Sequence, residues 1–556
     1  KENTSRDSYI PSDVYYALQR KSRGNLGYGK RQQSTLEGTL TFQHKFGELL
    51  DMNLMAGMGR YLDSGDGSDI SYENANDHIQ GSSVGMADGP FYPTSYKYKN
   101  EKRSQFVRGN FDLLGRYVVS ASLRRDGTDK FFPSKKYALF PSVSLAWKMN
   151  EESFIKNISW INMLKLRASY GETGSDNLGT TLYGIVTTTR EDVQFNNNSV
   201  TYIPYILSGA NYEDVTWQKT VMKNIGLDFS VLRDRIWGSV DVFRNDVTHL
   251  LGTAPTELLG MHGTRPINGG HYKRTGVDVS LNSLNLQTHD FKWTSQITLS
   301  HYNAVWIERM PNYDYQKYQK RKNEPMNAFY YYKTTGIINV DKSNMPESQR
   351  SLGPAACMPG YPIVEDKNGD GIIDVNDSYM DNTLPKLYFG FGNTFTWKNF
   401  DLDIFMYGQL GVKKWNDAYG NSIDVGGLSR GVDAHNVGIY SYNIWNTQTN
   451  TNGRFPGIAI SKSVALPENL GFDYTRENAS YIRVRNITLG YNLGPKELSV
   501  FKGYIRGIRV FVDFQNPLTF TKYKGYDPEI NTSSSNLTGG QYPQMRVYSI
   551  GAKLTF

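Results

Sequence analysis

The chain has 556 residues, a formal net charge of +7 and 38% hydrophobic residues, below the roughly 45–50% usual for soluble globular domains. Aromatic residues reach 13%, and a single cysteine, Cys357, excludes an intrachain disulfide or a cysteine metal cluster. The basic balance is mild and scattered, which argues against a nucleic-acid partner. No apolar run approaches the ~18 residues that a spanning helix needs, so a membrane form of this chain would cross as strands.

Strand signals follow one another along almost the whole chain, after a polar stretch, 1–34, that is typical of a loop. In Thr35–Phe46, for example, Leu40 and Phe42 share one face and threonines occupy the other. Such period-two runs, bounded by turn residues, predict an all-β protein of about fifteen strands. The predicted strands are 35–46, 51–61, 102–113, 116–125, 137–149, 164–171, 217–232, 236–247, 275–286, 291–301, 387–397, 402–411, 481–493, 505–516 and 546–556.

The links between these strands alternate in length. Two-residue to four-residue turns alternate with long polar loops, of which the longest are 62–100, 172–214, 302–384 and 412–478. Outer-membrane barrels have short periplasmic turns and long extracellular loops, whereas a soluble sandwich has no reason to gather its long links at one end. The loop lengths therefore predict an antiparallel transmembrane β-barrel, with 302–384 and 412–478 as its largest extracellular loops.

The last strand, Arg546–Phe556, alternates between an apolar face and a small or polar face. Its own alternation fits either the final strand of a soluble sandwich or a barrel strand between lipid and a wet lumen. The one-sided distribution of long loops favours the barrel. A chain ending on an aromatic residue also looks like the closing signal of an outer-membrane barrel, here carried by Tyr548, Ile550, Leu554 and Phe556.

The sharpest local motif is DKNGDGIIDVND, 366–377, within the first of the two largest loops. It has the spacing of a twelve-residue calcium loop, in which calcium takes six to eight oxygen ligands around an invariant glycine turn, here Gly371. The alternative is a turn-rich loop without metal. We expect a structural Ca2+ site rather than a catalytic one. Its predicted ligands are Asp366, Asn368, Asp370, the carbonyl of Ile372, Asp374 and Asp377.

Aromatic and polar side chains give weaker hypotheses about what the protein contacts. Tyrosines gather in the loop 313–332 and could stack on a sugar or a covering partner, although packing within the loop is an equal alternative. The substrate-binding candidates are Tyr315, Tyr318, Tyr330 and Tyr331. Polar residues on the second face of the strands would line the lumen or contact a plug, and most are expected to be simple solvated wall. They are Lys45, Arg108, Asp112, Arg124, Asp228, Asp241, Asp403 and Asp513.

Five segments in order resemble signatures of the SusC/RagA family of TonB-dependent outer-membrane transporters. They are ASLRRDGTDKFFPSKKYALFPSVSLAW (121–147), LKLRASYGETGSDNLG (164–179), TWQKTVMKNIGLDFSVLRDRI (216–236) with DVFRNDVTHLL after it, ASYIRVRNITLGYNL (479–493) and VFVDFQNPLTFTKYKGYDPE (510–529). Each segment alone is a weak match, but together they span most of the chain. The resemblance implies a 22-stranded barrel with an internal plug, of which residues 1–556 would be the C-terminal portion of the wall, without the plug or the TonB box.

The resemblance also implies a function and partners. The complete protein would take up oligosaccharides or peptides by TonB-dependent active transport, together with a SusD-like surface lipoprotein that acts as a lid. It would reach the TonB complex through the missing N-terminal part, contact membrane lipid and lipopolysaccharide, and could form a dimer of transporter–lipoprotein pairs. The expected location is the outer membrane of a Gram-negative bacterium of Bacteroidota type.

Two other functions remain open from the residues themselves. A passive channel or porin would show the same strands and loops, and a surface-attached β-rich glycan-binding protein would share the aromatic loops. Enzyme activity is not expected, because the sequence contains no HExxH or His-pair spacing, no GxSxG elbow and no phosphate-binding glycine loop.

Overall fold

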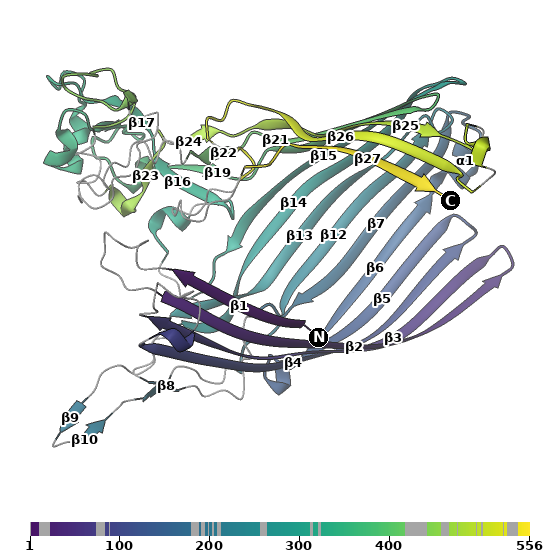
Figure 1. Ribbon diagram of the computed structural model, residues 1–556, viewed down its shortest axis with the longest axis horizontal. Helices are drawn as coiled ribbons and strands as arrows, with labels where there is room; N and C mark the ends of the chain where they lie inside the picture. The colour runs from purple at the N-terminus through teal and green to yellow at the C-terminus, as the bar shows by residue number, and fades with distance from the viewer. Residues whose placement is uncertain are drawn as a thin grey trace.

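One large antiparallel sheet makes up most of the molecule. The computed structural model describes residues 2–10, 23–73, 84–87, 89–178, 188–190, 195–197, 200–202, 205–207, 213–255, 264–311, 315–320, 324–416, 442–457, 466–474, 476–495, 497–501, 504–525, 527–530 and 543–556. Sixteen strands are hydrogen-bonded in the order β1-β2-β3-β4-β5-β6-β7-β12-β13-β14-β15-β20-β21-β25-β26-β27, so that each pairs with its neighbour in sequence within this sheet (Figure 1). The predicted fold class, an antiparallel all-β wall, is confirmed.

The bounds of the strands show how regular the sheet is. They are β1 (Glu2–Ile10), β2 (Arg23–Phe46), β3 (Leu50–Glu73), β4 (Phe91–Leu113), β5 (Tyr117–Thr128), β6 (Tyr137–Lys148), β7 (Ile161–Ser175), β12 (Gln218–Val231), β13 (Ile236–Pro255), β14 (Thr264–Gln287), β15 (Phe291–Glu308), β20 (Leu387–Trp397), β21 (Phe400–Leu410), β25 (Tyr481–Leu493), β26 (Gly507–Thr521) and β27 (Val547–Thr555).

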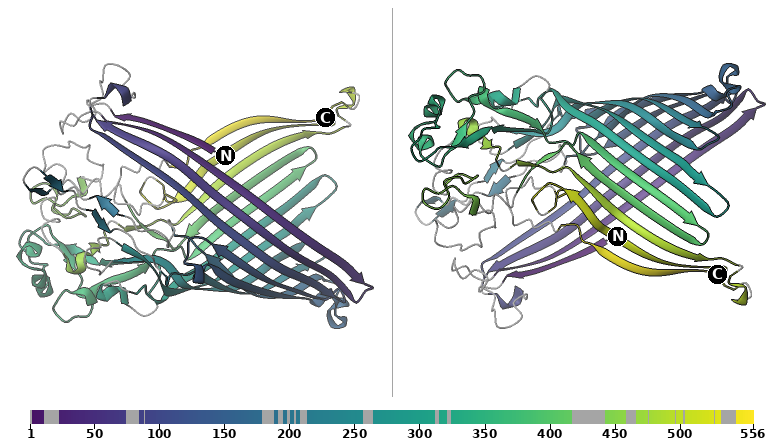
Figure 2. Two further views of the ribbon diagram at one scale, coloured as in Figure 1. Left: turned by 90° about the horizontal axis from the view of Figure 1, so that it is seen from below. Right: turned by 90° about the horizontal axis from the view of Figure 1, so that it is seen from above.

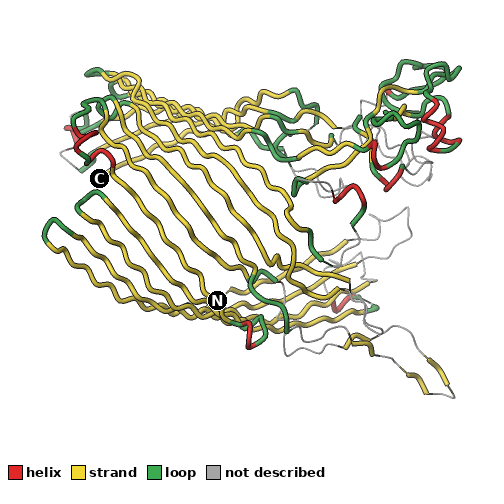
Figure 3. The backbone as a smooth tube through the Cα atoms, turned by 180° about the vertical axis from the view of Figure 1, so that it is seen from behind, coloured by secondary structure: helices red, strands yellow, loops and turns green. Residues whose placement is uncertain are grey.

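Short turns join the strands at one end of the sheet, and long connections join them at the other (Figure 3). The turn between β4 and β5 illustrates the local cause. Leu114 and Gly115 have φ of 57° and 68°, a left-handed pair within the turn that the Arg116 N–H closes on the Leu113 carbonyl at 3.0 Å, and such a pair matches the twist of the flanking strands. The long connections need no such fixed geometry, because they lie where backbone groups can bond to water.

The sheet is strongly curved, and its concave side opens between β27 and β1 (Figures 1 and 2). These are the two edge strands: β27 pairs with β26, β1 pairs with β2, and no described strand pairs with the outer edge of either.

Two details of the predicted strands are wrong. The sheet has sixteen strands rather than about fifteen, because the stretch 1–34 contains β1 and the first part of β2. The predicted loop 62–100 is also mostly strand, since β3 continues to Glu73 and β4 begins at Phe91. The β3 extension, 62–73, is rich in Gly, Ser and Asp, which are typical of loops, so its strand signal is weak. The β4 extension does alternate through Tyr96, Lys97, Tyr98 and Lys99, and the prediction overlooked this signal.

A separate lobe is built from small elements at the loop end of the sheet, opposite α1 (Figure 1). Its strands are β16 (Ala328–Tyr332), β17 (Thr334–Ile337), β18 (Pro362–Val364), β19 (Tyr379–Asn382) and β23 (Gly471–Phe472), and its short 3-10 helices are η6 (Glu347–Leu352), η7 (Pro354–Cys357), η8 (Val375–Asp377) and η11 (Pro467–Asn469). β16 pairs with β19 antiparallel and with β23 parallel, which joins the two largest loops into one folded unit.

The remaining elements are short. They are strands β8 (Thr188–Arg190), β9 (Phe195–Asn197), β10 (Val200–Tyr202), β11 (Tyr205–Leu207), β22 (Lys413–Trp415) and β24 (Arg476–Asn478), helix α1 (Ser153–Lys156), and 3-10 turns η2 (Val84–Met86), η3 (Pro133–Lys135), η4 (Met149–Glu151), η5 (Lys317–Lys320) and η12 (Ser499–Phe501). In the part of the chain that the structure describes, no helix has the length and apolar character to cross a membrane.

Candidate functional site

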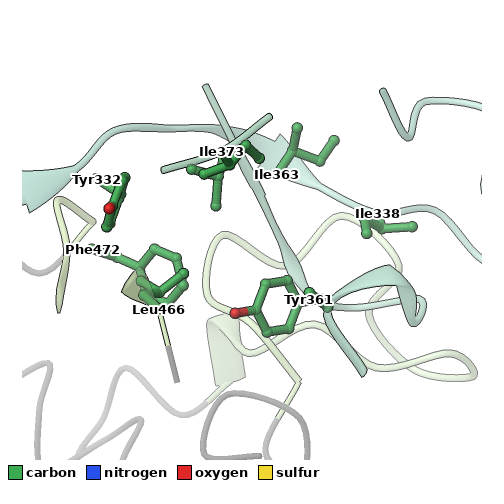
Figure 4. Packing of buried hydrophobic residues seen from close by; sticks show 9 residues of the cluster. Tyr332, Ile338, Tyr361, Ile363, Ile373, Leu466 and Phe472 are labelled. Atoms are coloured by element: carbon green, nitrogen blue, oxygen red, sulfur yellow. The ribbon is translucent and has the colours of Figure 1, made fainter. Parts of the chain in front are cut away.

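The lobe has a hydrophobic core of its own, shown in Figure 4. Tyr332 from β16 and Phe472 from β23 belong to this core, and both come from strands that pair with each other. The other core residues are Ile338, Ala356, Tyr361, Ile363, Val364, Ile373 and Leu466. Burial of these side chains is the main stabilising contribution available to a unit with such short strands. The lobe is therefore one packed platform rather than a set of independent loops.

The predicted calcium loop lies on this platform and has the expected turn. Gly371 has φ of 83°, and its N–H donates to Asp366 Oδ2 at 2.9 Å, while Gly369 N–H donates to Asp366 Oδ1 at 2.7 Å. Asn368 Nδ2 donates to Asp370 Oδ2 at 2.8 Å, which brings the predicted ligands at positions three and five together. These oxygen donors suit a hard cation chemically.

The last predicted ligand of the loop is engaged in a different way. Asp377 is fully buried, and its carboxylate accepts the N–H groups of Lys367 at 2.9 Å and Asp374 at 2.8 Å. The Asp374 carboxylate in turn accepts the N–H of Asn376 at 2.7 Å, forming a capping box at η8. Among the described residues, no group of three or more His, Cys, Asp or Glu side chains converges in a metal-binding arrangement. The calcium site stays a prediction.

The loop is tied directly to the core of the lobe. Ile373 is buried in the core, and its N–H donates to Ser351 Oγ at 2.8 Å. The hydroxyl of Tyr332 donates to the carbonyl of Asp374 at 3.0 Å. Ile372, whose carbonyl is a predicted ligand, has an exposed side chain. The loop is therefore attached to the packed core of the lobe at two adjacent residues, Ile373 and Asp374.

Three of the four candidate tyrosines gather around a buried carboxylate that the sequence did not reveal. Glu324, 2% exposed, accepts the hydroxyl of Tyr330 and pairs with Arg309. The ring of Tyr318 lies 4.6 Å from that of Tyr330, and the Arg309 guanidinium lies 5.0 Å from the centroid of Tyr315. Each ring thus has a protein contact.

Tyr331, the fourth candidate, lies apart from this cluster. Its side chain is buried and stacks on Tyr379 with ring centroids 5.9 Å apart. Burial and the neighbouring Asp381 raise the pKa of Tyr331 to about 12. The guanidinium of Arg476 lies 5.5 Å from its ring and also pairs with Asp381 at 3.1 Å. This tyrosine is a packing residue of the lobe in the described structure.

Most of the predicted lumen residues have a polar partner on their own strand or on a nearby strand. The clearest case is Arg167, which donates to Asp228 at 2.7 and 2.9 Å and to Asp241 at 3.1 Å. The other pairs are Asp112 with Lys148, Arg124 with Asp126, Asp403 with Thr394 and Asp513 with Thr488. Six of the eight predicted lumen residues are thus held by hydrogen bonds or ion pairs within the wall, and Lys45 and Arg108 are the two without such an ion pair among the described residues.

A second buried ion pair attaches a loop to the outer end of the wall. Arg483 in β25 is 2% exposed and donates to Asp527 at 2.7 Å and to Glu529 at 2.6 Å. The hydroxyl of Tyr407 also donates to Glu529, at 2.8 Å. Neither this pair nor Arg309 with Glu324 could be predicted from the sequence, because each residue is ordinary in its own segment and the pairing exists only after folding.

The predicted closing signal lies on the apolar face of the last strand. In β27, Tyr548, Ile550 and Leu554 are register partners of Phe514, Val512 and Ile508 in β26, so apolar residues meet across both strands. Phe556 follows the end of the strand and is exposed. This face has no protein to cover it within the described chain, which is the condition that lipid satisfies in a membrane barrel.

Comparison with known proteins decides the family. The family described as TonB dependent receptor-like, beta-barrel, matches residues 2–516. The chain belongs to this family. The TonB-dependent receptor P3 of Formosa agariphila is 26% identical over 595 residues, covering 100% of this chain and 55% of that protein. The TonB-dependent receptor SusC of Bacteroides thetaiotaomicron is 28% identical over 484 residues, covering 83% of this chain and 44% of that protein.

Solved structures of the family share the fold. The RagAB peptide transporter superposes with a TM-score of 0.77 at 21% identity, covering 100% of this chain and 59% of the compared chain. The SusC/RagA resemblance predicted from the five segments is confirmed, and so is the predicted location in the outer membrane. The chain spans about half the length of the curated relatives that it matches.

Proposed function

We propose that the complete protein is a TonB-dependent importer of oligosaccharides or peptides that works with a SusD-like surface lipoprotein. The observation that carries this proposal is the match of the whole described wall to the RagAB peptide transporter, together with the family match over residues 2–516. The relatives are TonB-dependent receptors, and none is an enzyme by name. Transport rather than catalysis is accordingly the proposed activity.

The described geometry supports this proposal in two ways. The polar face of the wall is cross-linked by pairs such as Arg167 with Asp228, which would give a plug or a passing solute a rigid wet surface. The lobe at the loop end offers a folded platform, which a lipoprotein lid would need as a docking surface. RagAB is a peptide transporter, and for this chain we propose both oligosaccharides and peptides as substrate classes.

Uptake in living cells tests the proposal. Cells that lack the gene should lose uptake of one class of labelled oligomer, either oligosaccharides or peptides, and the full-length gene should restore it. Collapse of the proton gradient should abolish this uptake, since active transport depends on the TonB complex. Uptake that persists without the gradient would identify a passive channel, and extraction of the protein without detergent would identify a soluble or surface-attached binding protein.

We also propose that the loop 366–377 binds Ca2+ and thereby orders the lobe. The donor oxygens of Asp366, Asn368 and Asp370 and the carbonyl of Ile372 would hold the ion, with Asp374 and Asp377 completing the set. The observed turn at Gly371 supports the proposal, since it is the turn that the motif requires.

Elemental analysis of the purified full-length protein tests the calcium proposal. The D370A variant should lose one calcium per chain and become more sensitive to protease within the lobe. D341A is a matched control, because Asp341 forms a similar turn with Ser343 in the same lobe but lies outside the motif. An equal calcium content in D370A and the native protein would reject the site.

A further inference from the structure

A shallow groove of about 690 Å3 lies on the outer, apolar side of the wall. It crosses β6, β7, β12, β13, β14 and β15, which are consecutive strands of the sheet (Figure 1). Its position is defined by register, because residues that are partners across neighbouring strands share one face. The groove is on the same face as the apolar residues that lipid covers, so it is separate from the lumen and from the lobe.

Two adjacent rows of partner residues form the floor and the upper border of this groove. The floor row is Leu145, Ala168, Ile225, Val242, Val277 and His301. The border row, two residues further along each strand toward the long loops, is Val143, Tyr170, Lys223, Arg244, Thr275 and Asn303. The row below the floor is entirely apolar, with Trp147, Leu166, Leu227, Val240, Val279 and Leu299.

The basic side chains stand together on the side of the groove nearer the long loops. Lys223 and Arg244 are direct register partners, both are exposed, and Lys223 makes no ion pair among the described residues. Arg244 donates through Nε and Nη2 to Asp246, both at 2.8 Å, which leaves Nη1 without a hydrogen bond to any described residue. His301 is bonded through Nδ1 to the carbonyl of Lys386 at 2.6 Å. No acidic residue lines the groove.

The distance of Lys223 and Arg244 from the short-turn end of the sheet indicates which layer of the bilayer surrounds them. Lys223 is the ninth residue of β12 counted back from Val231 at the short-turn end, and Arg244 is the ninth residue of β13 counted from Ile236. A strand crosses the hydrocarbon core of a bilayer in ≈ 9–11 residues. The two cations therefore lie at the outer boundary of the apolar band, beside lipid headgroups.

Other strands carry basic residues at the same level of the outer face. Arg125 is the ninth residue of β5 counted from Tyr117, and Arg60 is the eleventh residue of β3 counted from Leu50. Arg60 is already paired with Glu101 at 3.0 Å, and Arg125 lies 4.1 Å from the ring centroid of Tyr137. The groove differs from these positions in two ways. Lys223 makes no ion pair among the described residues, and a recess with an apolar floor lies beside it.

We propose that this groove is a binding site for a phosphorylated lipid of the outer leaflet. The phosphate would lie between Lys223 and Arg244, since guanidinium and ammonium groups are the preferred protein donors to phosphate. The acyl chains would lie along Ile225 and Val242 and the apolar row beneath them. The occupant is a lipid rather than a soluble anion, because the groove continues without a break into the lipid-covered face.

Lipid retention by the full-length protein in detergent micelles tests the proposal. The probes are a bisphosphorylated lipid A, the same lipid after enzymatic dephosphorylation, and phosphatidylcholine, each counted by native mass spectrometry. The K223Q/R244Q variant should lower retention of the bisphosphorylated lipid about thirtyfold, given roughly 1 kcal/mol for each of the two basic residues near an anionic lipid surface. Retention of the dephosphorylated lipid and of phosphatidylcholine should be unchanged.

Two further variants make the result decisive. K45Q/R108Q removes two positive charges from the opposite face of the wall and should retain the bisphosphorylated lipid as the native protein does. K223R/R244K keeps both charges in the groove and should also retain it, even if the neutral variant folds poorly. Equal loss in the lumen variant, or equal binding of the dephosphorylated lipid, would overturn the proposal. So would displacement of the lipid by millimolar inorganic phosphate, which would mean that the groove binds a free anion.

Discussion

The wall and the lobe are stabilised in opposite ways, although one chain forms both. In the wall, every strand from β2 to β26 pairs on both edges, and the apolar side chains point away from the protein toward lipid. In the lobe, the strands are two to five residues long, and stability depends on buried side chains such as Tyr332 and Tyr361. Backbone hydrogen bonds dominate the first region, and burial of apolar surface dominates the second.

This difference predicts how each region responds to substitution. A side chain on the lipid face of the wall has little protein around it, so truncation leaves no cavity but a new charge meets hydrocarbon. A side chain in the lobe core is enclosed on all sides, so truncation leaves a cavity while the wall is unaffected. Four substitutions, ordered from the largest expected effect to the smallest, test the contrast.

Tyr332→Ala should have the largest effect, confined to the lobe. Tyr332 is fully buried, packs in the core and donates its hydroxyl to the carbonyl of Asp374. Large-to-small changes of this kind cost about 4 kcal/mol. Limited proteolysis of the full-length variant should cut the lobe far sooner than in the native protein. The wall should remain folded, which heat-dependent gel mobility measures. The milder Tyr332→Phe loses only the hydrogen bond and about 1 kcal/mol; equal sensitivity of both variants would contradict the cavity argument.

Arg483→Met should release the loop that carries Asp527 from the wall. Removing one partner of a buried pair leaves an uncompensated charge and costs about 3 kcal/mol. Hydrogen exchange of residues 522–530 should accelerate accordingly. Arg485→Met is the control, because Arg485 is the neighbouring exposed arginine on the same strand. If both variants exchange equally fast, the pair does not hold the loop.

The same loop should respond to acid in a defined direction. Burial alone would raise the pKa of Asp527, but the N–H groups of Glu529 and Gln544 and the Arg483 ion pair outweigh it and hold the pKa below its usual value. A depressed carboxyl pKa stabilises the fold above about pH 4, the unfolded value, and this contribution is lost as pH falls through the lower folded value. Exchange of 522–530 should therefore be constant from neutral pH to about pH 5, after correction for intrinsic rates, and accelerate below pH 4.

Ile550→Lys should destabilise the wall through the lipid rather than through the protein. Ile550 is 78% exposed on the apolar face of β27, and a lysine there costs about 2–3 kcal/mol near the bilayer midplane. Ser549→Lys, one residue away, points to the polar face and has Asp513 as its register partner, so it should cost little. Urea unfolding in lipid vesicles measures both. A comparable loss in Ser549→Lys would show that the two faces are not lipid and lumen.

The sequence predicted the wall because its physical cause is local and repeats every second residue. Alternation, as in the last strand, specifies which face meets lipid, and short turns such as Leu114-Gly115 specify which end meets the periplasm. The prediction was wrong where this alternation is weak. β1 and the extension of β3 are rich in Ser, Asp, Asn or Gly, and pairing with the next strand of the sheet is what makes them strands.

The candidate sites were less predictable because their partners are far apart in sequence. The calcium motif could be found, since its ligands are confined to twelve residues, 366–377. Glu324 with Arg309 and Arg483 with Asp527 could not, because no spacing rule connects residues that only the fold brings together. The pair of Lys223 and Arg244 becomes visible only when the register of β12 on β13 is known.

Leu114→Asn should stabilise the wall slightly, and it tests whether the short turns are as constrained as their geometry implies. Leu114 has φ of 57°, a left-handed conformation that costs a leucine about 1 kcal/mol and that asparagine adopts more readily. Its N–H bond to the carbonyl of Leu49 should remain, because the backbone does not change. Leu49→Asn is the matched control in the neighbouring turn, since Leu49 is equally exposed but has no positive φ. The urea midpoint should rise for Leu114→Asn alone; a rise in both variants would mean that polarity at the periplasmic end, rather than backbone strain, sets the stability of the turns.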